Sequence, residues 1–216
     1  MELYFGPLAC SMATRISLYE AGASAKFTYV DTRTKRTGDG ADYLAINPLG
    51  QVPALRIDSP EGRGDDLLLE NQAILQYVAD RFPAAHLAPP PGRERARLQQ
   101  WLSFIATELH KPVYIPLLVR DVPEGAREFA RKLAPARFAV LERHLADREF
   151  VLDRFTIADA YLTTVLNWSR ASGIDLAQWP AVKAYYERTL KRPSVAKALA
   201  EEFALYREEE ARRKAA

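Results

Sequence analysis

The chain changes character near residue 82, and this change constrains the fold more than any other feature of the sequence. Before it, short runs rich in β-branched and aromatic residues alternate with helical runs, which predicts a small mixed sheet with helices against it. After it, almost every segment has helical periodicity. Between them, Pro89-Pro90-Pro91-Gly92 is typical of a stiff linker. We therefore expect a domain at 1–82, a linker at 83–92 and an all-helical domain at 93–216.

The expected elements of the first domain follow the order β-α-β-β-β-α. The predicted strands are Glu2–Phe5, Phe27–Asp31, Val52–Ile57 and Asp66–Leu69, and the predicted helices are Ser11–Ala21 and Glu70–Arg81. In the second domain the predicted helices are Arg93–His110, Glu124–Ala146, Ile157–Ala171, Pro180–Lys191 and Pro193–Glu210. Thr156 and Asp159 have the spacing of a capping box. The acid–base pairs of the last helix indicate a solvated surface.

Composition excludes several classes of protein. Of the 216 residues, 48% are hydrophobic, which is typical of a globular protein and not of a disordered or fibrous one. Because 30 basic residues stand against 28 acidic ones, neither nucleic acid nor an anionic membrane is indicated as a partner. The start of the chain lacks the features of a secretory signal, and no run approaches the roughly 20 apolar residues of a membrane span. We expect a cytoplasmic protein.

Cys10 is the single cysteine, which excludes an internal disulfide and an all-cysteine zinc site. With only three scattered histidines as well, we expect no bound metal. Cys10 immediately precedes the first predicted helix, where free N–H groups and the helix dipole favour a thiolate and so raise reactivity. The alternative is a small buried hydrophobic residue. A Cys-x-x-Cys motif is absent, because Ala13 stands three residues further on.

Two further stretches have the residues of a ligand site. Val52-Pro53 opens a predicted strand, and a cis bond there would turn the Val52 backbone outward to pair with an extended peptide; a plain loop is the alternative. Glu70-Asn71 begins the next predicted helix. A carboxylate and free N–H groups at that position can hold the ammonium and carboxylate of one zwitterionic ligand, or they can be ordinary capping groups.

Five segments in order along the chain carry a family pattern: Leu3–Ser11, Ile46–Leu55, Glu70–Asp80, Glu108–Lys111 and Phe155–Asp159. Together they resemble the bacterial beta-class cytosolic glutathione transferases, and the resemblance covers essentially the whole chain. It implies an α/β thioredoxin-like N-terminal domain, an all-α C-terminal helical domain, and glutathione as the thiol cosubstrate.

The resemblance also implies which residues bind glutathione. They are Lys35, Gln51, Val52, Pro53, Glu70, Asn71 and Lys111. Val52 would pair through its backbone with the cysteinyl part of glutathione, next to a cis Pro53. Glu70 and Asn71 match the pair that holds the γ-glutamyl end, and Lys35 matches a lysine that reaches the glycine carboxylate.

Cys10 and His110 are the residues that the resemblance implies to be catalytic. The cysteine of the family lies beside the glutathione sulfur and can form a mixed disulfide with it, while His110 and Lys111 match residues that project toward the cysteine and the electrophile pocket. A packed or surface histidine is the alternative for His110. Two residues depart from the family: Phe5 replaces a common tyrosine, and Asn71 replaces Gly or Ser. Candidates for an apolar wall of the electrophile pocket are Tyr114, Ile115 and Leu117.

The expected function is that of a glutathione transferase, which conjugates glutathione to hydrophobic electrophiles in detoxification. Thiol–disulfide exchange through Cys10 is a second expected reaction. Two alternatives stay open: a non-catalytic binding or regulatory protein of the same fold, and a glutathione-dependent isomerase or dehalogenase. The family implies a homodimer, with no nucleic-acid or membrane partner.

Overall fold

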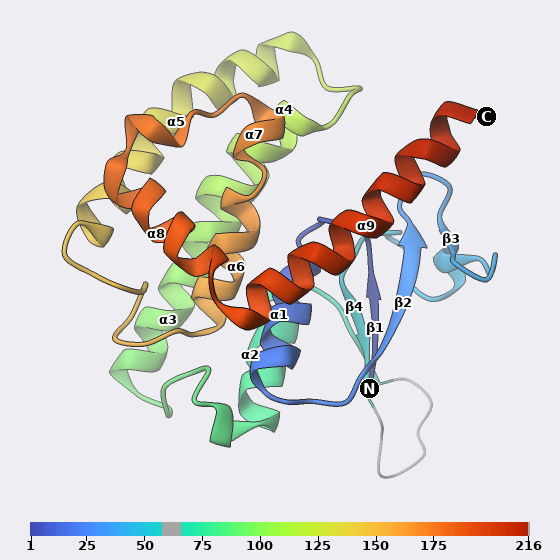
Figure 1. Ribbon diagram of the computed structural model, residues 1–216, viewed down its shortest axis with the longest axis horizontal. Coiled ribbons are helices and arrows are strands. Elements are labelled where there is room, and N and C mark those ends of the chain that lie inside the picture. The colour runs from blue at the N-terminus through green and yellow to red at the C-terminus, as the bar shows by residue number, and fades with distance from the viewer. Residues whose placement is uncertain (58–65, 216) are drawn as a thin grey trace. The chain divides into compact units, whose positions relative to one another are not determined.

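The computed structural model describes residues 1–57 and 66–215, which form two compact units (Figure 1). Unit 1 consists of Met1–Leu87 and Pro193–Ala216, and unit 2 consists of Ala88–Arg192. The final helix therefore groups with the N-terminal part of the chain, whereas the sequence placed it in a helical domain at 93–216.

Within the described residues, unit 1 contains a mixed sheet of five strands in the order β3-β2-β1-β4-β5. Their bounds are Glu2–Phe5 for β1, Lys26–Asp31 for β2, Arg36–Thr37 for β3, Ala54–Arg56 for β4 and Leu67–Leu68 for β5. β1 pairs in parallel with β2, and the other neighbouring strands are antiparallel. The predicted strands are all present, and β3 is an addition to them. A parallel pair joined by a helix, followed by antiparallel strands, is the expected thioredoxin-like arrangement.

The helices of unit 1 lie against this sheet (Figure 1). They are α1 (Met12–Glu20), α2 (Asn71–Arg81) and α9 (Pro193–Ala215), with short 3₁₀ turns η1 (Tyr43–Ala45) and η2 (Pro83–Ala85). Successive side chains of a strand point to opposite faces. Leu3 and Phe5 accordingly join a core with Leu18 of α1, while Tyr4 points to the other face and packs with Tyr43.

The C-terminal helix α9 runs alongside α1 (Figure 1). Leu205 packs against the core that α1 and α2 share with the sheet. Further along, Glu209 is only 7% exposed and pairs with Arg213, which also reaches Asp31. The expectation of a solvated surface at this tail is therefore wrong for Glu209, because the helix packs over β2 as well as α1.

Unit 2 is helical throughout its regular elements. Its bounds are Arg93–Phe104 for α3, Ile105–Tyr114 for the π-helical segment η3, Ile115–Leu118 for α4, Glu124–Leu145 for α5, Ile157–Leu166 for α6, Ser169–Ser172 for α7, Leu176–Gln178 for the 3₁₀ turn η4 and Pro180–Leu190 for α8. The predicted helix ending at His110 instead continues as η3 to Tyr114. Pro112 has no N–H and its ring crowds an α-helical turn, and the wider π turn accommodates it.

α6 is the central helix of unit 2, and every one of its residues is buried. A helix that is buried on all sides is typical of a core position. Its start is the predicted capping box, which the structure confirms: Thr156 accepts from the Ala158 N–H, and Asp159 accepts from the Thr156 N–H. Among the helices that the structure describes, none is long and apolar enough to cross a membrane.

Candidate functional site

Cys10 lies in the segment Gly6–Ser11, which joins β1 to α1 and is called here the Cys10 loop. The Ser11 Oγ ties the two ends of this loop together, since it accepts from the Gly6 N–H and donates to the Gly6 carbonyl, both at 3.2 Å. Cys10 is a half-buried cysteine two residues before the first residue of α1. The structure thus confirms the predicted place of Cys10 at the entry to the first helix.

The Cys10 thiol is directed at the stretch that the sequence singled out before β4. Its Sγ donates a hydrogen bond to the Val52 carbonyl at 3.2 Å. The Val52–Pro53 peptide bond is cis, which agrees with the sequence-based expectation. Cys10 and Val52, which are 42 positions apart in the sequence, therefore lie in contact.

Two residues that the sequence analysis did not assign hold the backbone next to Val52. The Tyr43 hydroxyl and the Asn47 side-chain amide both donate to the Gln51 carbonyl, at 2.8 and 2.9 Å. Burial raises the pKa of Tyr43 to about 12, so its hydroxyl stays a donor at neutral pH. The Asn47-Pro48 pair is a turn signal that could have drawn attention to Asn47. The Gln51 side chain is exposed, while the Gln51 carbonyl is fixed by these two hydrogen bonds.

Glu70 precedes α2 in a backbone conformation that is rare for a residue with a side chain. Its φ is 65° and its ψ is 116°. Left-handed φ values at residues other than glycine cost free energy and cluster at ligand-binding positions. The Glu70 side chain is exposed at the N-terminal end of α2, where free N–H groups favour an anionic partner.

Asn71 is the first residue of α2 and is 7% exposed. Its Oδ1 accepts from the Thr14 hydroxyl of α1 at 3.1 Å. Within the described part of the chain its buried Nδ2 has no hydrogen-bond partner. A buried amide without a partner is costly, and a ligand oxygen would satisfy it. The larger side chain that departs from the family pattern is thus held by α1.

Lys35 lies over the turn that precedes Val52. Its Nζ donates to the Gly50 carbonyl at 2.9 Å. A Cβ on Gly50, whose φ is +59°, would come within 2.8 Å of the Lys35 side chain. The absence of a side chain at Gly50 is therefore what lets Lys35 take this path. The Lys35 ammonium, bonded to the Gly50 carbonyl, is a cation that can pair with a ligand carboxylate.

His110 and Lys111 lie in η3 of unit 2. His110 is 6% exposed, and its Nδ1 lies 2.7 Å from the Tyr161 hydroxyl of α6. Its ring also packs against Trp168, at 4.9 Å between centroids. Burial lowers the pKa of His110 to about 4, and Lys111 adds to this effect, so the imidazole is neutral at pH 7. Lys111 itself is exposed.

The expectation that Tyr114 lines an electrophile pocket is wrong. Tyr114 is completely buried, its hydroxyl lies 2.7 Å from the Ser169 hydroxyl, and its ring packs edge-on against Phe138. It is part of the core of unit 2. Ile115 and Leu117, the other two candidates, are partly exposed and stay candidates for the apolar wall of that pocket.

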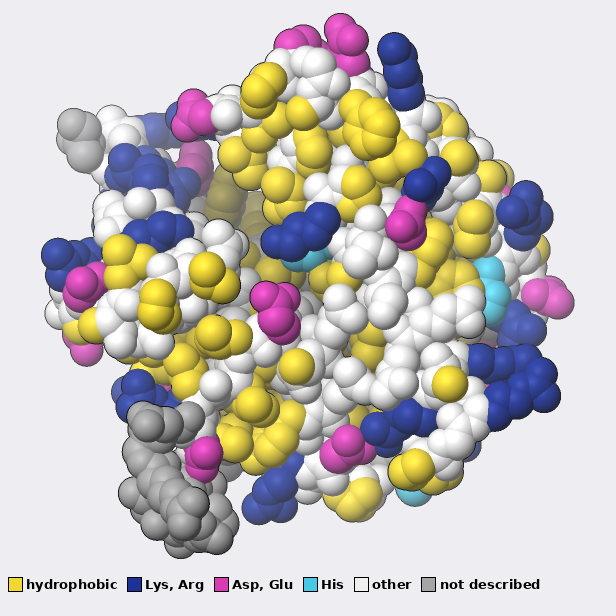
Figure 2. Space-filling model, turned by 180° about the vertical axis from the view of Figure 1, so that it is seen from behind, with side chains coloured by type: hydrophobic (Ala, Val, Ile, Leu, Met, Phe, Trp, Pro, Cys, Tyr) yellow, Lys and Arg dark blue, Asp and Glu magenta, His cyan; other side chains and the backbone are white. Residues whose placement is uncertain are grey.

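In the ranges 1–57 and 66–215, no group of three or more His, Cys, Asp or Glu side chains could hold a metal ion. The face drawn in Figure 2 shows Lys and Arg side chains scattered among Asp and Glu side chains. The chemistry of unit 1 is instead that of a thiol, an ordered backbone at Val52 and a helix N-terminus at Glu70. The backbone and the helix N-terminus suit a peptide-like zwitterion, and the Cys10 thiol can react with a ligand bound beside it.

Comparisons with known proteins agree with this arrangement. The family model of the glutathione S-transferase N-terminal domain matches residues 1–80, and that of the C-terminal domain matches residues 124–188. The glutathione S-transferase GstA of Escherichia coli O157:H7 is 40% identical over 204 residues, which cover 94% of this chain and 98% of that protein.

Two solved structures have the same fold as this chain. One is a sphingomonad glutathione S-transferase complexed with glutathione, with a TM-score of 0.86 and 40% identity. The other is a bacterial beta-class glutathione S-transferase of Sphingomonas chungbukensis, with the same TM-score and identity. Each alignment covers 94% of this chain and 98% of the other.

Proposed function

The chain belongs to the glutathione S-transferase family, in its bacterial beta class, and from this premise we propose how its residues bind and use glutathione. It is a glutathione transferase, and glutathione is its cosubstrate. The observation that carries the proposal is the contact between the Cys10 thiol and the Val52 carbonyl, because it brings the single cysteine of the chain to the backbone with which we expect the peptide ligand to pair.

In the proposed binding mode the cysteinyl part of glutathione pairs with the backbone of Val52, next to Pro53. The γ-glutamyl end lies at the start of α2, where its ammonium meets the exposed Glu70 carboxylate and its carboxylate meets the backbone N–H of Asn71. The partnerless Nδ2 of Asn71 supports this position. At the other end Lys35 exchanges its bond to the Gly50 carbonyl for the glycine carboxylate.

Conjugation follows from this position. The glutathione sulfur lies near the start of α1, where the positive end of the helix dipole stabilises its thiolate. The thiolate attacks a carbon of a hydrophobic electrophile, a carbon–sulfur bond forms, and the leaving group departs with the electron pair. Ile115 and Leu117 are the proposed apolar contacts for this electrophile.

Thiol–disulfide exchange is the second proposed reaction, and it uses Cys10 directly. The Cys10 thiolate attacks the glutathionyl sulfur of a mixed disulfide, so that the other thiol leaves and a Cys10–glutathione disulfide forms. A second glutathione thiolate then attacks this disulfide, releases glutathione disulfide and restores Cys10. The partial exposure of Cys10 supports this step, because a disulfide substrate must reach its sulfur.

His110 and Lys111 are proposed to assist catalysis from unit 2. Because His110 is neutral at pH 7, we assign it the role of a hydrogen-bonding group and not that of a cationic acid. Lys111 supplies a positive charge for an anionic ligand. Both roles stay predictions.

We also propose that the protein is a cytoplasmic homodimer. Leu44 and Leu49, near the turn that precedes Val52, have exposed fractions of 43% and 65%. They offer apolar surface for a second copy of the chain. The cytoplasm keeps thiols such as that of Cys10 reduced, as the proposed reactions need. Sedimentation equilibrium of the wild type and of Leu49→Glu tests the dimer, which the glutamate is expected to weaken.

The test of the proposed function compares wild type with Cys10→Ala in three measurements. These are glutathione affinity by calorimetry, conjugation of a chloronitrobenzene, and reduction of the mixed disulfide of glutathione and 2-mercaptoethanol. Cys10→Ala is expected to bind glutathione within about threefold of wild type and to lose disulfide exchange completely. If Cys10→Ala exchanged disulfides at the wild-type rate, the proposed covalent role of Cys10 would be wrong. If the wild type did not bind glutathione in calorimetry, the proposed binding mode would be wrong.

A further inference from the structure

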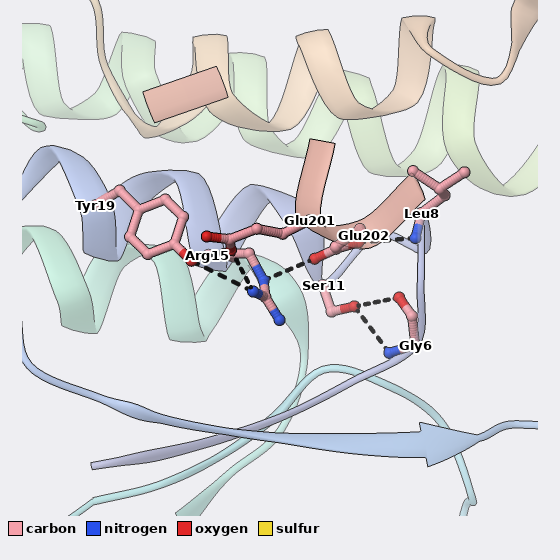
Figure 3. A network of polar contacts seen from close by, with 7 residues as sticks. All are labelled: Gly6, Leu8, Ser11, Arg15, Tyr19, Glu201 and Glu202. Atoms are coloured by element: carbon pink, nitrogen blue, oxygen red, sulfur yellow. Dashed lines mark hydrogen bonds and ion pairs between the residues drawn. The ribbon is translucent and has the colours of Figure 1, made fainter. Parts of the chain in front are cut away.

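The Cys10 loop has a partner at the far end of the chain. Leu8, in the middle of the loop, has a left-handed backbone with a φ of 58°. Its N–H donates to the Glu202 Oε2 of α9 at 2.7 Å, across 194 residues of sequence. Figure 3 shows Glu202 reaching from α9 to Leu8, while the Ser11 side chain closes the loop on Gly6.

Glu202 is held on its other side by Arg15 of α1. The Glu202 Oε1 lies 3.0 Å from the Arg15 Nε, and the two side chains are 0% and 5% exposed. The Arg15 guanidinium is itself fixed between the rings of Phe5 and Phe27, each centroid 4.2 Å away. One carboxylate therefore joins three segments: the Cys10 loop, α1 and α9.

The Glu202 carboxyl group is fully buried, which disfavours its charged form. Burial raises the pKa of Glu202, and the Arg15 guanidinium and the Leu8 N–H oppose that rise. Buried charges of this kind depend on every partner they have, and a hydrogen bond to a charged group is about twice as strong as a neutral one. Removing Glu202 would take away an ion-pair partner of the Arg15 guanidinium and the acceptor of the Leu8 N–H bond.

The neighbouring Glu201 offers a comparison within the same network. Its Oε2 lies 3.0 Å from the Arg15 Nη1 and also accepts from the Tyr19 hydroxyl, yet its side chain is 41% exposed. Glu201 bonds the outer side of Arg15 and has no bond to the Cys10 loop among the described contacts (Figure 3). The two glutamates thus share α9 and Arg15 but differ in their connection to Leu8.

We propose that Glu202 is a positioning residue for Cys10: it fixes Leu8, and through the loop it holds the thiol at the Val52 carbonyl. The proposal rests on the proposed function, since it concerns the same glutathione site. Because Val52 and Glu70 lie outside the Cys10 loop, loss of Glu202 displaces the reacting sulfur and leaves the glutathione-binding groups in place. The expected signature is a change in kcat for disulfide exchange without a matching change in KM.

The experiment compares Glu202→Ala, Glu202→Gln and the control Glu201→Gln with wild type, at a temperature where circular dichroism shows each variant folded. We expect Glu202→Ala to lower kcat for disulfide exchange about tenfold, with KM for glutathione within about threefold. Glu202→Gln keeps an oxygen for the Leu8 N–H and should lose less. Glu201→Gln should match wild type.

Alkylation by iodoacetamide gives a second readout that needs no glutathione, and the single cysteine makes the signal unambiguous. A released loop should expose the half-buried thiol and speed its alkylation, most in Glu202→Ala and less in Glu202→Gln. A purely structural role predicts lower stability with unchanged kcat and alkylation rate. Unchanged kcat and alkylation rate in the folded Glu202 variants would overturn the proposal. Where Glu202→Ala does not fold, the same result in Glu202→Gln alone would overturn it. A change in Glu201→Gln as large as that in the Glu202 variants would also overturn it. If wild type exchanges no disulfide, the proposed function fails, while alkylation still decides the role of Glu202.

Discussion

His110 makes the stability of unit 2 depend on pH in a predictable direction. Burial lowers its pKa from 6.5 to about 4, so the folded state binds this proton more weakly than the unfolded state. The stabilising contribution is therefore fully present above pH 6.5 and is lost as the pH falls toward 4. The perturbation that isolates it is His110→Asn, because the amide occupies the place of Nδ1 beside the Tyr161 hydroxyl and does not titrate.

The size of the effect follows from the two pKa values. At pH 5 the unfolded histidine is almost fully protonated and the folded one is about one-tenth protonated, which corresponds to a loss of about 2 kcal/mol. At pH 7 the same calculation gives about 0.2 kcal/mol. Between pH 7 and pH 5 the free energy of unfolding of the wild type should thus fall by about 2 kcal/mol more than that of His110→Asn.

Urea unfolding followed by tryptophan fluorescence measures this difference. The three tryptophans, Trp101, Trp168 and Trp179, all belong to unit 2, so the signal reports on the unit that contains His110. Titrations at pH 7, 6 and 5 for both proteins cancel the contributions of the other titrating groups. Equal losses of stability in wild type and variant, or a larger loss in the variant, would refute the reasoning.

Three further outcomes are expected. Thr156→Ala removes the cap that accepts from the Ala158 N–H and should lower the free energy of unfolding by about 1–2 kcal/mol in urea titrations; an unchanged midpoint would contradict this. Gly50→Ala places a Cβ against Lys35 in a backbone of positive φ, and calorimetry should show weaker glutathione binding than in wild type; wild-type affinity would count against the role of Lys35. Phe138→Ala, which removes a fully buried ring, should cost about 3–5 kcal/mol in urea titrations, and a loss below 1 kcal/mol would contradict its place in the core.

Much of the fold was predictable because the pattern is local. Leu3 and Phe5 alternate with Tyr4 along β1, and this alternation correctly places them on opposite faces of the sheet. The strand and helix limits differ mostly by one or two residues, as expected where chain ends fray. β3 was missed because Arg36–Thr37 has only two residues and carries no alternation that could reveal it.

In the candidate site, the positions of two residues could be predicted because their place relative to a helix or a strand can be read from the sequence. These are Cys10 at a helix entry and Pro53 before a strand, and the structure joins them through the Val52 carbonyl. The orientation of Asn71 toward Thr14 depends on how two helices pack, and no local pattern reports it. Glu202 was missed for the same reason, because a glutamate in a charged helix is indistinguishable by sequence from its exposed neighbours.

The bond between Leu8 and Glu202 can form only late in the synthesis of the protein, after α9 has been translated. Leu8 leaves the ribosome long before Glu202, which is translated 194 residues later. Domains generally fold as units, N-terminal ones first, but here unit 1 lacks α9 until the whole of unit 2 has been translated. A chain released before α9 would contain Cys10, Val52, Glu70 and His110 and still lack the carboxylate that fixes the Cys10 loop. The Cys10 thiol of such a chain would react from a loop that Glu202 does not hold in place.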